Sequence, residues 1–324
     1  MEFKDKGMSK EGARHDPQHD LPQRLRMETD AKITMLGTGN AHCTRCYNTC
    51  FTLQDAGGGI MLVDAGGGNG ILAQMERVGL RTADIHDIFV THAHTDHLLG
   101  VVWVVRMALE HGCRLNVWSH EKVLVLLDFV CRQILPAKAT ARLGDIVRFR
   151  RIEDGDAFNV GGMRLQCFDI HSAKERQFGF TAVLSDGVRL CCLGDEPYNA
   201  LCRQYAQDAD WLMHEAFCTY ADRERFKPYE KNHSTALDAG RNATDLHVKN
   251  LILYHTEDRT LETRPERYAA EAGECFSGNI IVPNDLDVIV LARPSGPYLD
   301  ITGSPSASSY PKDGKSTPYE KEMT

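Results

Sequence analysis

Hydrophobic and polar positions divide the chain into a regularly patterned centre and two polar ends. In the centre, short runs of aliphatic residues alternate with longer stretches in which apolar residues recur every three or four positions, which is typical of strands and amphipathic helices respectively. Strands are predicted at residues 32–37, 50–54, 60–64, 88–91, 114–118, 146–149, 163–168, 178–184, 188–193, 211–214, 251–254 and 288–291. Helices are predicted at residues 70–78, 98–109, 121–134, 198–206, 235–246 and 265–276.

The order of these elements predicts an α/β fold. Two strand-rich blocks are each followed by helices, and a sheet with one apolar face must bury it against another layer. Ser185-Asp186-Gly187, between two of the strands, is a good hairpin turn. We therefore expect two stacked mixed sheets with helices on the outside.

The polar ends predict tails on either side of one domain. Residues 1–31 hold six basic and seven acidic side chains, and residues 293–324 are rich in Ser, Pro, Gly, Lys and Asp. We expect a disordered N-terminal extension at 1–31, a folded domain at 32–292 and a disordered C-terminal tail at 293–324. The first thirty residues lack the apolar stretch of a signal peptide. The apolar stretch at 98–109 is broken by Arg106 and is too short to cross a membrane.

Charge and cysteine content narrow the class of protein. The formal net charge is -8, and the tails contribute -1 and 0, so the central domain carries -7. Dedicated nucleic-acid binders usually have a basic surface, so we expect no stable DNA partner. The eleven cysteines are an odd number without secretory context, which favours reduced thiols in a cytoplasmic protein. Cys43, Cys46 and Cys50 form a tight cluster, but no second ligand pair follows, so we expect small buried side chains there.

The strongest chemical signal is the run Thr91-His92-Ala93-His94-Thr95-Asp96-His97. Three histidines and a carboxylate at this density are hard to explain as packing, because each buried polar group needs a partner. The run follows a buried strand and precedes a helix, where α/β folds gather ligands. His92 and His94 can share one metal ion, and Asp96 and His97 can point to a second. The alternative is a solvated histidine-rich turn.

Three further candidate ligands also stand where predicted strands end. His171 follows the strand at 163–168, Asp195 follows the strand at 188–193, and His255 follows the strand at 251–254. Taken singly, each could be a surface residue. Together with the run at 92–97 they supply five histidines and two carboxylates, which suits a pair of borderline metals such as zinc. Asp195 is the natural bridge, since each of its oxygens can take one ion.

The order of these motifs resembles the metallo-β-lactamase superfamily. The resemblance rests on Asp64-Ala65-Gly66-Gly67, the run at 92–97, His171, Gly194-Asp195 and His255, and it covers nearly all of the central domain. Other segments look most like the ribonuclease Z branch: Leu36-Gly37-Thr38-Gly39, Phe178-Gly179-Phe180, His214-Glu215-Ala216-Phe217 and His233-Ser234-Thr235-Ala236. The resemblance implies the αββα sandwich of that superfamily.

The resemblance also implies a ligand set and a reaction. His92, His94 and His171 would hold one zinc ion, and Asp96, His97 and His255 the other, with Asp195 between them. We expect two Zn²⁺ per chain, with Mn²⁺ or Fe²⁺ as alternatives. A metal-bound hydroxide would then attack a phosphodiester of RNA or of a small nucleotide-like substrate.

Three other residues are assigned roles in that reaction. Asp96 can orient the attacking water or take its proton. His233 would contact the phosphate or protonate the leaving oxygen, as its counterpart is thought to do in the ribonuclease Z branch, and Glu215 could orient His233. From the residues alone, a helix-start role for His233 is equally good. His86, His111, His120 and His247 are expected to be solvated or satisfied locally.

The chain departs from many tRNA-processing relatives in one region. Those relatives carry a flexible arm between the counterparts of His171 and Asp195, but here the two residues are 24 positions apart and two predicted strands fill the interval. This argues against cleavage of precursor tRNA. The stretch from Tyr220 to His233 is charged and aromatic, and it is either a solvated loop or a lid that binds phosphate.

These observations favour a metal-dependent phosphodiesterase similar to ribonuclease Z. A lactonase, thioesterase or arylsulfatase of the same fold is the enzymatic alternative, and a non-catalytic metal-binding protein is the other. A small phosphodiester or RNA is the expected substrate, no membrane association is expected, and a homodimer is compatible with the sequence.

Overall fold

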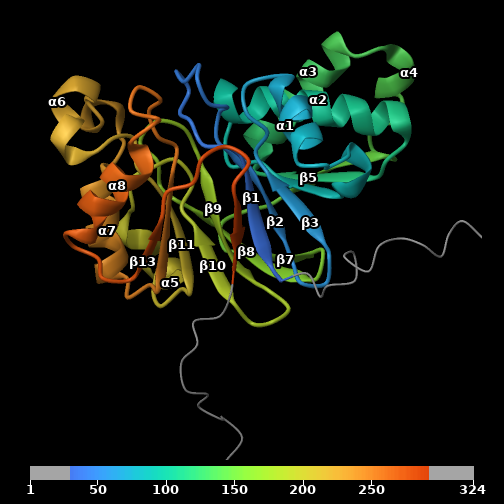
Figure 1. The fold of residues 1–324 in the computed structure, drawn as a ribbon. Coiled ribbons are helices and arrows are strands. Elements are labelled where there is room, and N and C mark those ends of the chain that lie inside the picture. Colours follow the sequence, from blue (N-terminus) through green and yellow to red (C-terminus); the bar gives the residue numbers. More distant parts are fainter. Residues whose placement is uncertain (1–29, 292–324) are drawn as a thin grey trace, which may run out of the picture. The chain divides into compact units, whose positions relative to one another are not determined.

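The computed structural model describes residues 30–291, and the two predicted tails lie outside the described residues apart from Asp30 and Ala31. Two seven-stranded sheets face each other, with helices α1 to α4 on one side and α6, α7 and α8 on the other (Figure 1). One sheet has the order β14-β1-β2-β3-β4-β5-β6 and the other has the order β13-β12-β11-β10-β9-β8-β7. Each sheet contains both parallel and antiparallel pairs. The predicted stack of two mixed sheets is confirmed.

The elements follow the predicted order closely. The strands of the first sheet are β1 (Lys32–Gly37), β2 (Cys50–Gln54), β3 (Ile60–Val63), β4 (Asp87–Phe89), β5 (Leu115–Ser119), β6 (Val147–Arg151) and β14 (Val288–Val290). Those of the second are β7 (Ala157–Val160), β8 (Met163–Asp169), β9 (Phe178–Val183), β10 (Arg189–Cys192), β11 (Trp211–Glu215), β12 (Asn250–Tyr254) and β13 (Asn279–Ile281). The α-helices are α1 (Gly70–Arg77), α2 (Thr95–His111), α3 (Glu121–Ile134), α4 (Ala137–Thr140), α5 (Arg203–Ala206), α6 (Arg223–Phe226), α7 (Ala236–Asp245) and α8 (Arg264–Gly273).

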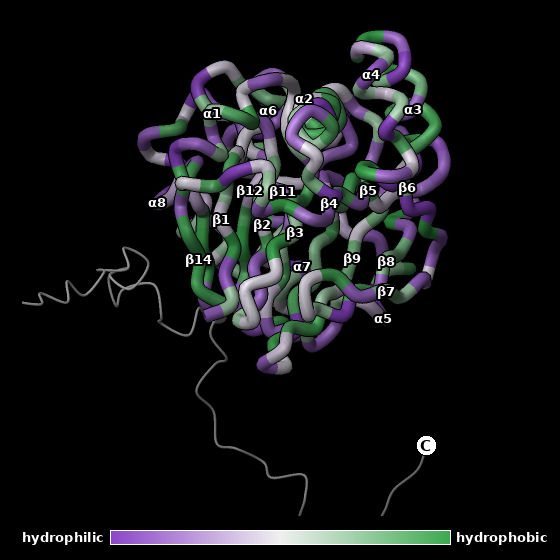
Figure 2. The backbone as a smooth tube through the Cα atoms, turned by 90° about the vertical axis from the view of Figure 1, so that its right-hand side faces the viewer, coloured by the Kyte–Doolittle hydropathy of each residue, from purple (hydrophilic) through white to green (hydrophobic). Residues whose placement is uncertain are grey.

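Three hydrophobic clusters lie between these layers. The cluster between the sheets takes residues from both, and Phe89 of β4 meets Phe180 of β9 with ring centroids 5.0 Å apart. A second cluster joins the first sheet to α1, α2 and α3, and a third joins the second sheet to α5, α7 and α8. Hydrophobic residues accordingly concentrate in the strands and in α2, whereas connecting loops are mostly hydrophilic (Figure 2). Cys191 and Cys192 point into different clusters, as expected for neighbours on a strand.

Some sequence-based expectations were wrong in detail. Edge strands β7 and β13 were not predicted, because a strand at the edge of a sheet exposes both polar and apolar side chains and loses the clear alternation. The helix predicted at 198–206 is a 3₁₀ turn followed by the four-residue α5. His120 is fully buried rather than solvated, and its Nε2 lies 2.9 Å from the carbonyl oxygen of Arg176.

Two glycines allow close approaches near one edge of the sheets. A Cβ atom at Gly100 of α2 would lie 1.8 Å from the carbonyl oxygen of Ala65, so the helix packs directly on the turn after β3. The backbone of Gly194 has φ +70°, a conformation that residues with a side chain rarely adopt. It turns the chain sharply after β10. Among residues 30–291, no helix is long and apolar enough to cross a membrane.

Candidate metal centre

Loops that leave the strands of both sheets bring the candidate ligands together. His92 and His94 follow β4, and α2 begins at Thr95. Asp195 follows β10, and His255 follows β12, which runs parallel to β11 and β10. The backbones of Asp64, His171 and His255 have φ of 53°, 56° and 57°. Left-handed backbone at residues other than glycine is uncommon and often accompanies functional sites.

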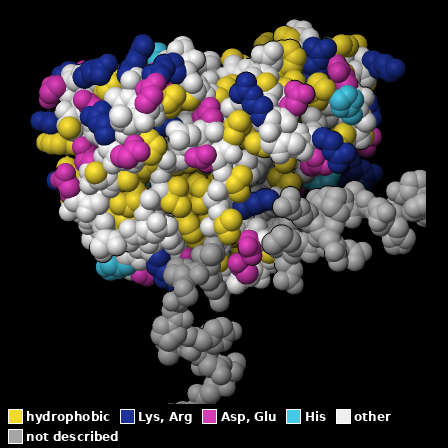
Figure 3. Space-filling model, in the orientation of Figure 1, with side chains coloured by type: hydrophobic (Ala, Val, Ile, Leu, Met, Phe, Trp, Pro, Cys, Tyr) yellow, Lys and Arg dark blue, Asp and Glu magenta, His cyan; other side chains and the backbone are white. Residues whose placement is uncertain are grey.

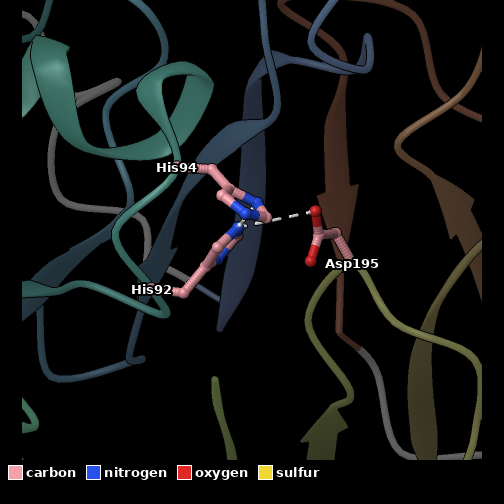
Figure 4. Close-up of side chains that lie close together, drawn as sticks. All are labelled: His92, His94 and Asp195. Atoms are coloured by element: carbon pink, nitrogen blue, oxygen red, sulfur yellow. Dashed lines mark hydrogen bonds and ion pairs between the residues drawn. The ribbon is translucent and has the colours of Figure 1, made fainter. Parts of the chain in front are cut away.

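The first group consists of His92, His94 and Asp195, whose ligand atoms all lie within 4.8 Å of one another. His92 Nε2 lies 2.9 Å from His94 Nδ1 and 3.6 Å from Asp195 Oδ2 (Figure 4). Nitrogen and oxygen ligands about 2.0–2.2 Å from a tetrahedral zinc ion lie roughly 3.3–3.6 Å from one another. The distance between His92 and Asp195 fits one such ion, whereas the two histidine nitrogens are at hydrogen-bond distance and would separate by a few tenths of an ångström to share it.

The second group consists of Asp96, His97 and His255 and has similar spacing. His97 Nε2 lies 3.3 Å from Asp96 Oδ2, and His255 Nε2 lies 3.7 Å from the same oxygen. Both nitrogens are buried without a hydrogen-bond partner among residues 30–291. A buried nitrogen that faces other ligand atoms without a hydrogen bond is costly, and a cation between them would remove that cost. The donor set of the two groups, four histidine nitrogens and the carboxylate oxygens of Asp96 and Asp195, fits zinc.

One oxygen of Asp195 faces both groups. Oδ2 lies 3.6 Å from His92 Nε2 and 3.4 Å from both His97 Nε2 and His255 Nε2. Oδ1 instead accepts a hydrogen bond from Gln177 Nε2, which is itself buried. The arrangement therefore differs from the expectation that each oxygen would serve one ion, since Oδ2 alone is directed at both groups.

Asp64 orients two candidate ligands, His97 directly and His92 through Thr91. Its Oδ2 accepts a hydrogen bond of 2.7 Å from His97 Nδ1 and another of 2.7 Å from the Thr91 hydroxyl. The Thr91 hydroxyl oxygen lies 2.9 Å from His92 Nδ1, so it can accept a hydrogen bond from that ring while donating its own hydrogen bond to Asp64. Nε2 is therefore the atom that each ring would offer to a metal ion at the centre of the site. Carboxylates that orient ligating histidines in this way are usual in zinc proteins.

Burial and the charges of neighbouring groups shift the pKa values of these side chains in opposite directions. Burial lowers the pKa of His92 well below its usual value, and Asp195 opposes this only in part. Burial would also lower the pKa of His97, but Asp96 and Asp64 reverse the shift and hold that pKa well above its usual value. Burial would raise the pKa of Asp195, whereas His92, His97 and His255 hold it well below its usual range. The carboxylate is therefore ionised and available to a cation.

His233 stands beside this centre, supported by Glu215 at the end of β11. Its Nδ1 lies 3.6 Å from Glu215 Oε2, and its ring stacks on Phe217 with centroids 4.8 Å apart. Glu215 is fully buried, and its other oxygen accepts a hydrogen bond from the backbone N–H of Ser234. Thr235 and Asp238 then form a capping box that starts α7. Thr235, and neither Ser234 nor Asn232, is the cap, so His233 is left free to face the cavity.

His171 is not brought into either group. Its ring is exposed, and the hydrogen bond found for it is from its backbone N–H to Asp169 Oδ1. Gln177, six residues further along the same loop, contacts His92 and Asp195 instead: its Nε2 lies 3.0 Å from His92 Nδ1. Gln177 carried no sequence signal, because a glutamine beside a strand is as common on a surface as in a site.

His94, Asp96, Asp195 and His255 of these two groups line a cavity of about 530 Å³, and His92 and His97 are buried behind them. We call His92, His94, Asp96, His97, Asp195 and His255 the cavity floor. We call a second set the rim: His171, Lys174 and Lys231. Lys174 and Lys231 line the cavity, and His171 does not. Asn40, His42 and Phe217 complete the wall. The sequence analysis missed Lys174, whose ammonium lies 3.4 Å from His233 Nε2.

The charged stretch from Tyr220 to His233 folds into short helical turns around α6. Lys231 and His233 line the cavity, whereas Lys227 pairs with Glu224 and Arg225 lies over the ring of Phe226. Basic and acidic side chains are interspersed on the surface at the α6 end of the molecule (Figure 3). Most of the stretch is therefore a charge-balanced surface, and its far end forms part of the wall.

Comparison with known proteins indicates the family and the fold of the chain. The family model described as "Anti-Pycsar protein Apyc1" matches residues 31–267. A ribonuclease Z from Bradyrhizobium diazoefficiens is 25% identical over 313 aligned residues, covering 80% of this chain and 99% of that protein.

Solved structures share the fold at lower identity. The metallo-β-lactamase fold protein YhfI from Bacillus subtilis superposes with a TM-score of 0.64 at 18% identity, over 81% of this chain and 99% of that one. The short form of human tRNase Z superposes with a TM-score of 0.62 at 22% identity, over 81% of this chain and 99% of that one. The chain therefore belongs to the family described as anti-Pycsar protein Apyc1, and it is a metal-dependent hydrolase of the metallo-β-lactamase superfamily, near the ribonucleases Z.

Proposed function

We propose that this protein is a dinuclear zinc phosphodiesterase that acts on small phosphodiesters, such as cyclic nucleotides, in preference to precursor tRNA. The observation that carries the proposal is the single oxygen, Asp195 Oδ2, that lies 3.4–3.6 Å from ligand nitrogens of both groups. His92 and His94 would hold one ion and Asp96, His97 and His255 the other. We retain His171 as a proposed fourth ligand of the first ion, which requires its ring to turn inward.

The metal ions would supply an activated water and neutralise charge on the phosphoryl oxygens. The chain's own residues would do the rest. Asp96 would orient the attacking water, and its Oδ2 lies 3.3 Å from His97 Nε2 and 3.7 Å from His255 Nε2. His233 is the group proposed to contact the phosphate and protonate the leaving oxygen, because it lines the cavity within 5.2 Å, between ring centroids, of His255. Glu215 would hold the proton on His233 Nδ1.

The size of the cavity supports a small substrate. A volume of about 530 Å³ lies within the range of roughly 300–1,000 Å³ that is usual for sites that bind small molecules. The interval between His171 and Asp195 is filled by a short loop, β9, a turn and β10, which leaves no room for an arm that could grip tRNA. Binding of a polyanion also draws on many basic contacts, and the central domain is acidic.

The test is an activity panel on metal-loaded protein. It compares bis(p-nitrophenyl) phosphate, a set of cyclic nucleotides, p-nitrophenyl sulfate, a lactone and precursor tRNA at one moderate salt concentration, with metal content measured on the same samples. We expect about two zinc ions per chain and a kcat/KM for small diesters well above that for tRNA. Accurate cleavage of tRNA at a higher kcat/KM would refute the size argument. Reaction with only the lactone or the sulfate would refute the phosphodiesterase assignment while leaving the metal centre intact.

A further inference from the structure

Lys174 places a positive charge at the cavity wall, beside the proposed acid. It lies in the loop between β8 and β9, and its side chain is 23% exposed. Its Nζ lies 2.9 Å from Glu196 Oε1, 3.4 Å from the carbonyl oxygen of Asn232 and 3.4 Å from His233 Nε2. The ammonium thus joins the loop after β8, the loop after β10 and the segment before α7, at the point where they meet above the floor.

The position of this ammonium is set by a buried partner. Glu196 directly follows Asp195, is 5% exposed, and also accepts a hydrogen bond of 2.9 Å from the Ser172 hydroxyl. The Ser172 hydroxyl oxygen in turn accepts a bond of 3.1 Å from the backbone N–H of Lys174. The loop and the lysine side chain are therefore tied to the residue next to the proposed bridge, so the charge stands at a defined place relative to the metal centre.

The other lysine that lines the cavity is directed elsewhere. Lys231 Nζ donates to the carbonyl oxygen of Phe226 at 2.9 Å and lies 4.7 Å from the centre of the Phe217 ring. No arginine lines this cavity within residues 30–291. Lys174 is consequently the lysine whose ammonium lies next to His233, where a scissile phosphodiester would be held.

The contacts of Lys174 leave donor capacity for a ligand. An ammonium has three hydrogens, and Glu196 takes one at normal hydrogen-bond length. The contacts of 3.4 Å to Asn232 and His233 are longer than the usual N–H···O distance of about 2.9–3.0 Å, so they are weak and can be exchanged. A phosphate oxygen in their place would form a shorter, charge-assisted bond. A neutral ester has no anionic oxygen to offer there.

We propose that Lys174 is a specificity-determining residue that binds an anionic oxygen of the substrate beside His233 and so selects charged phosphodiesters over neutral esters. The inference rests on the proposed phosphodiesterase function. Glu196 acts as a positioning residue, since it holds the ammonium without lining the cavity itself.

The experiment compares Lys174→Met with wild type on two substrates that share a leaving group. These are bis(p-nitrophenyl) phosphate, which is an anion, and its methyl triester, which is neutral. For Lys174→Met we expect kcat/KM on the diester to fall about 10- to 100-fold, mainly through KM, in line with loss of one charge-assisted hydrogen bond. The inhibition constant of inorganic phosphate should rise by a similar factor. Activity on the triester should change less than about twofold, and metal content should be unchanged.

Two further variants separate this role from a structural one. Lys174→Arg keeps the charge and should retain most of the preference for the diester. Lys122→Met removes another lysine from the same neighbourhood, paired at 2.6 Å with Glu175 outside the cavity, and should behave as wild type. Equal losses of kcat/KM on diester and triester in Lys174→Met would overturn this inference but not the proposed function. An unchanged KM and an unchanged phosphate inhibition constant would do the same. A wild-type protein that hydrolyses no diester would overturn the proposed function and the inference with it.

Discussion

The floor and the rim of the cavity hold their side chains in different ways. On the floor, His97 is buried, hydrogen-bonded through Nδ1 to Asp64, and surrounded by ligand atoms at 3.3–3.4 Å. On the rim, the ring of His171 is exposed, and Lys174 has two of its three contacts at 3.4 Å. The floor is thus held in place by hydrogen bonds within the protein, whereas the exposed ring of His171 and the long contacts of Lys174 allow the rim to rearrange around a ligand.

This difference suggests a division of labour. Ligands that are held by hydrogen bonds need little reorganisation to bind metals, and they determine where the reaction occurs. A less constrained rim contacts the variable part of a substrate, where weak contacts can be exchanged for stronger ones. Changes on the floor should therefore remove metal and activity together. Changes at Lys174 on the rim should alter substrate preference with metal retained, and changes at His171 should affect metal binding only weakly.

The largest effect is expected for Asp195→Ala. Removing the carboxylate takes a ligand atom from both groups, so both metal content and activity should fall to near background. Elemental analysis and bis(p-nitrophenyl) phosphate hydrolysis would measure this, with Asp145→Ala, an exposed aspartate on a loop between α4 and β6, as the matched control. If the variant keeps full metal content and activity, the bridge has been assigned to the wrong residue.

His233→Ala should cost less than Asp195→Ala and should leave the metals in place. Loss of a proton donor typically lowers kcat by about 10²–10⁴-fold. Equal metal content in the variant and wild type is the decisive companion measurement, and His247→Ala, whose side chain is 68% exposed, serves as control. Loss of metal on replacing His233 would instead favour a ligand role, which its grouping with Glu215 and His255 makes geometrically feasible.

The floor could be predicted from the sequence because four of its residues lie within six positions of one another and the others follow predicted strands. The run at 92–97 stood out by composition alone, and Asp195 and His255 stood out because each ends an apolar run. Parallel strands place their C-terminal ends on one edge of a sheet, so Asp195 after β10 and His255 after β12 had to converge. The run at 92–97 follows β4 of the other sheet, and it meets them because the two sheets are stacked. The sheets themselves followed from apolar runs of the right length.

Lys174 of the rim and the nearby Gln177 could not be predicted in the same way. Lys174 and Gln177 lie in a short polar loop, and nothing in Ser172–Gln177 distinguishes a residue that faces the cavity from one that faces solvent. Their roles depend on contacts with Glu196, His233 and Asp195, which come from other loops. For the same reason the charge of the stretch from Tyr220 to His233 suggested phosphate binding, although Lys227 pairs with Glu224 and Arg225 lies over the Phe226 ring, and neither lines the cavity.

Asp64→Asn should weaken metal binding without removing any proposed ligand. Asparagine keeps the Oδ1 acceptor for the backbone N–H of Thr91 but no longer provides a carboxylate for His97 and the Thr91 hydroxyl. Loss of such a partner typically lowers metal affinity about 10- to 100-fold. Competition with a chromogenic chelator measures the affinity. An unchanged affinity would show that packing alone holds the His97 ring.

The smallest effect on metal affinity is expected for His171→Ala. Three protein ligands are the usual complement of a catalytic zinc ion, and His92, His94 and Asp195 already provide them for the first group. The exposed ring of His171 must turn inward to add a fourth, and it loses its rotational freedom in doing so. We therefore expect the affinity of the first ion to fall about tenfold or less, below the effect of Asp64→Asn. The same chelator competition, with His111→Ala as the control, measures both variants side by side. A loss as complete as that of Asp195→Ala would show that His171 belongs to the floor, and that the loop it begins closes over the first ion whenever metal is bound.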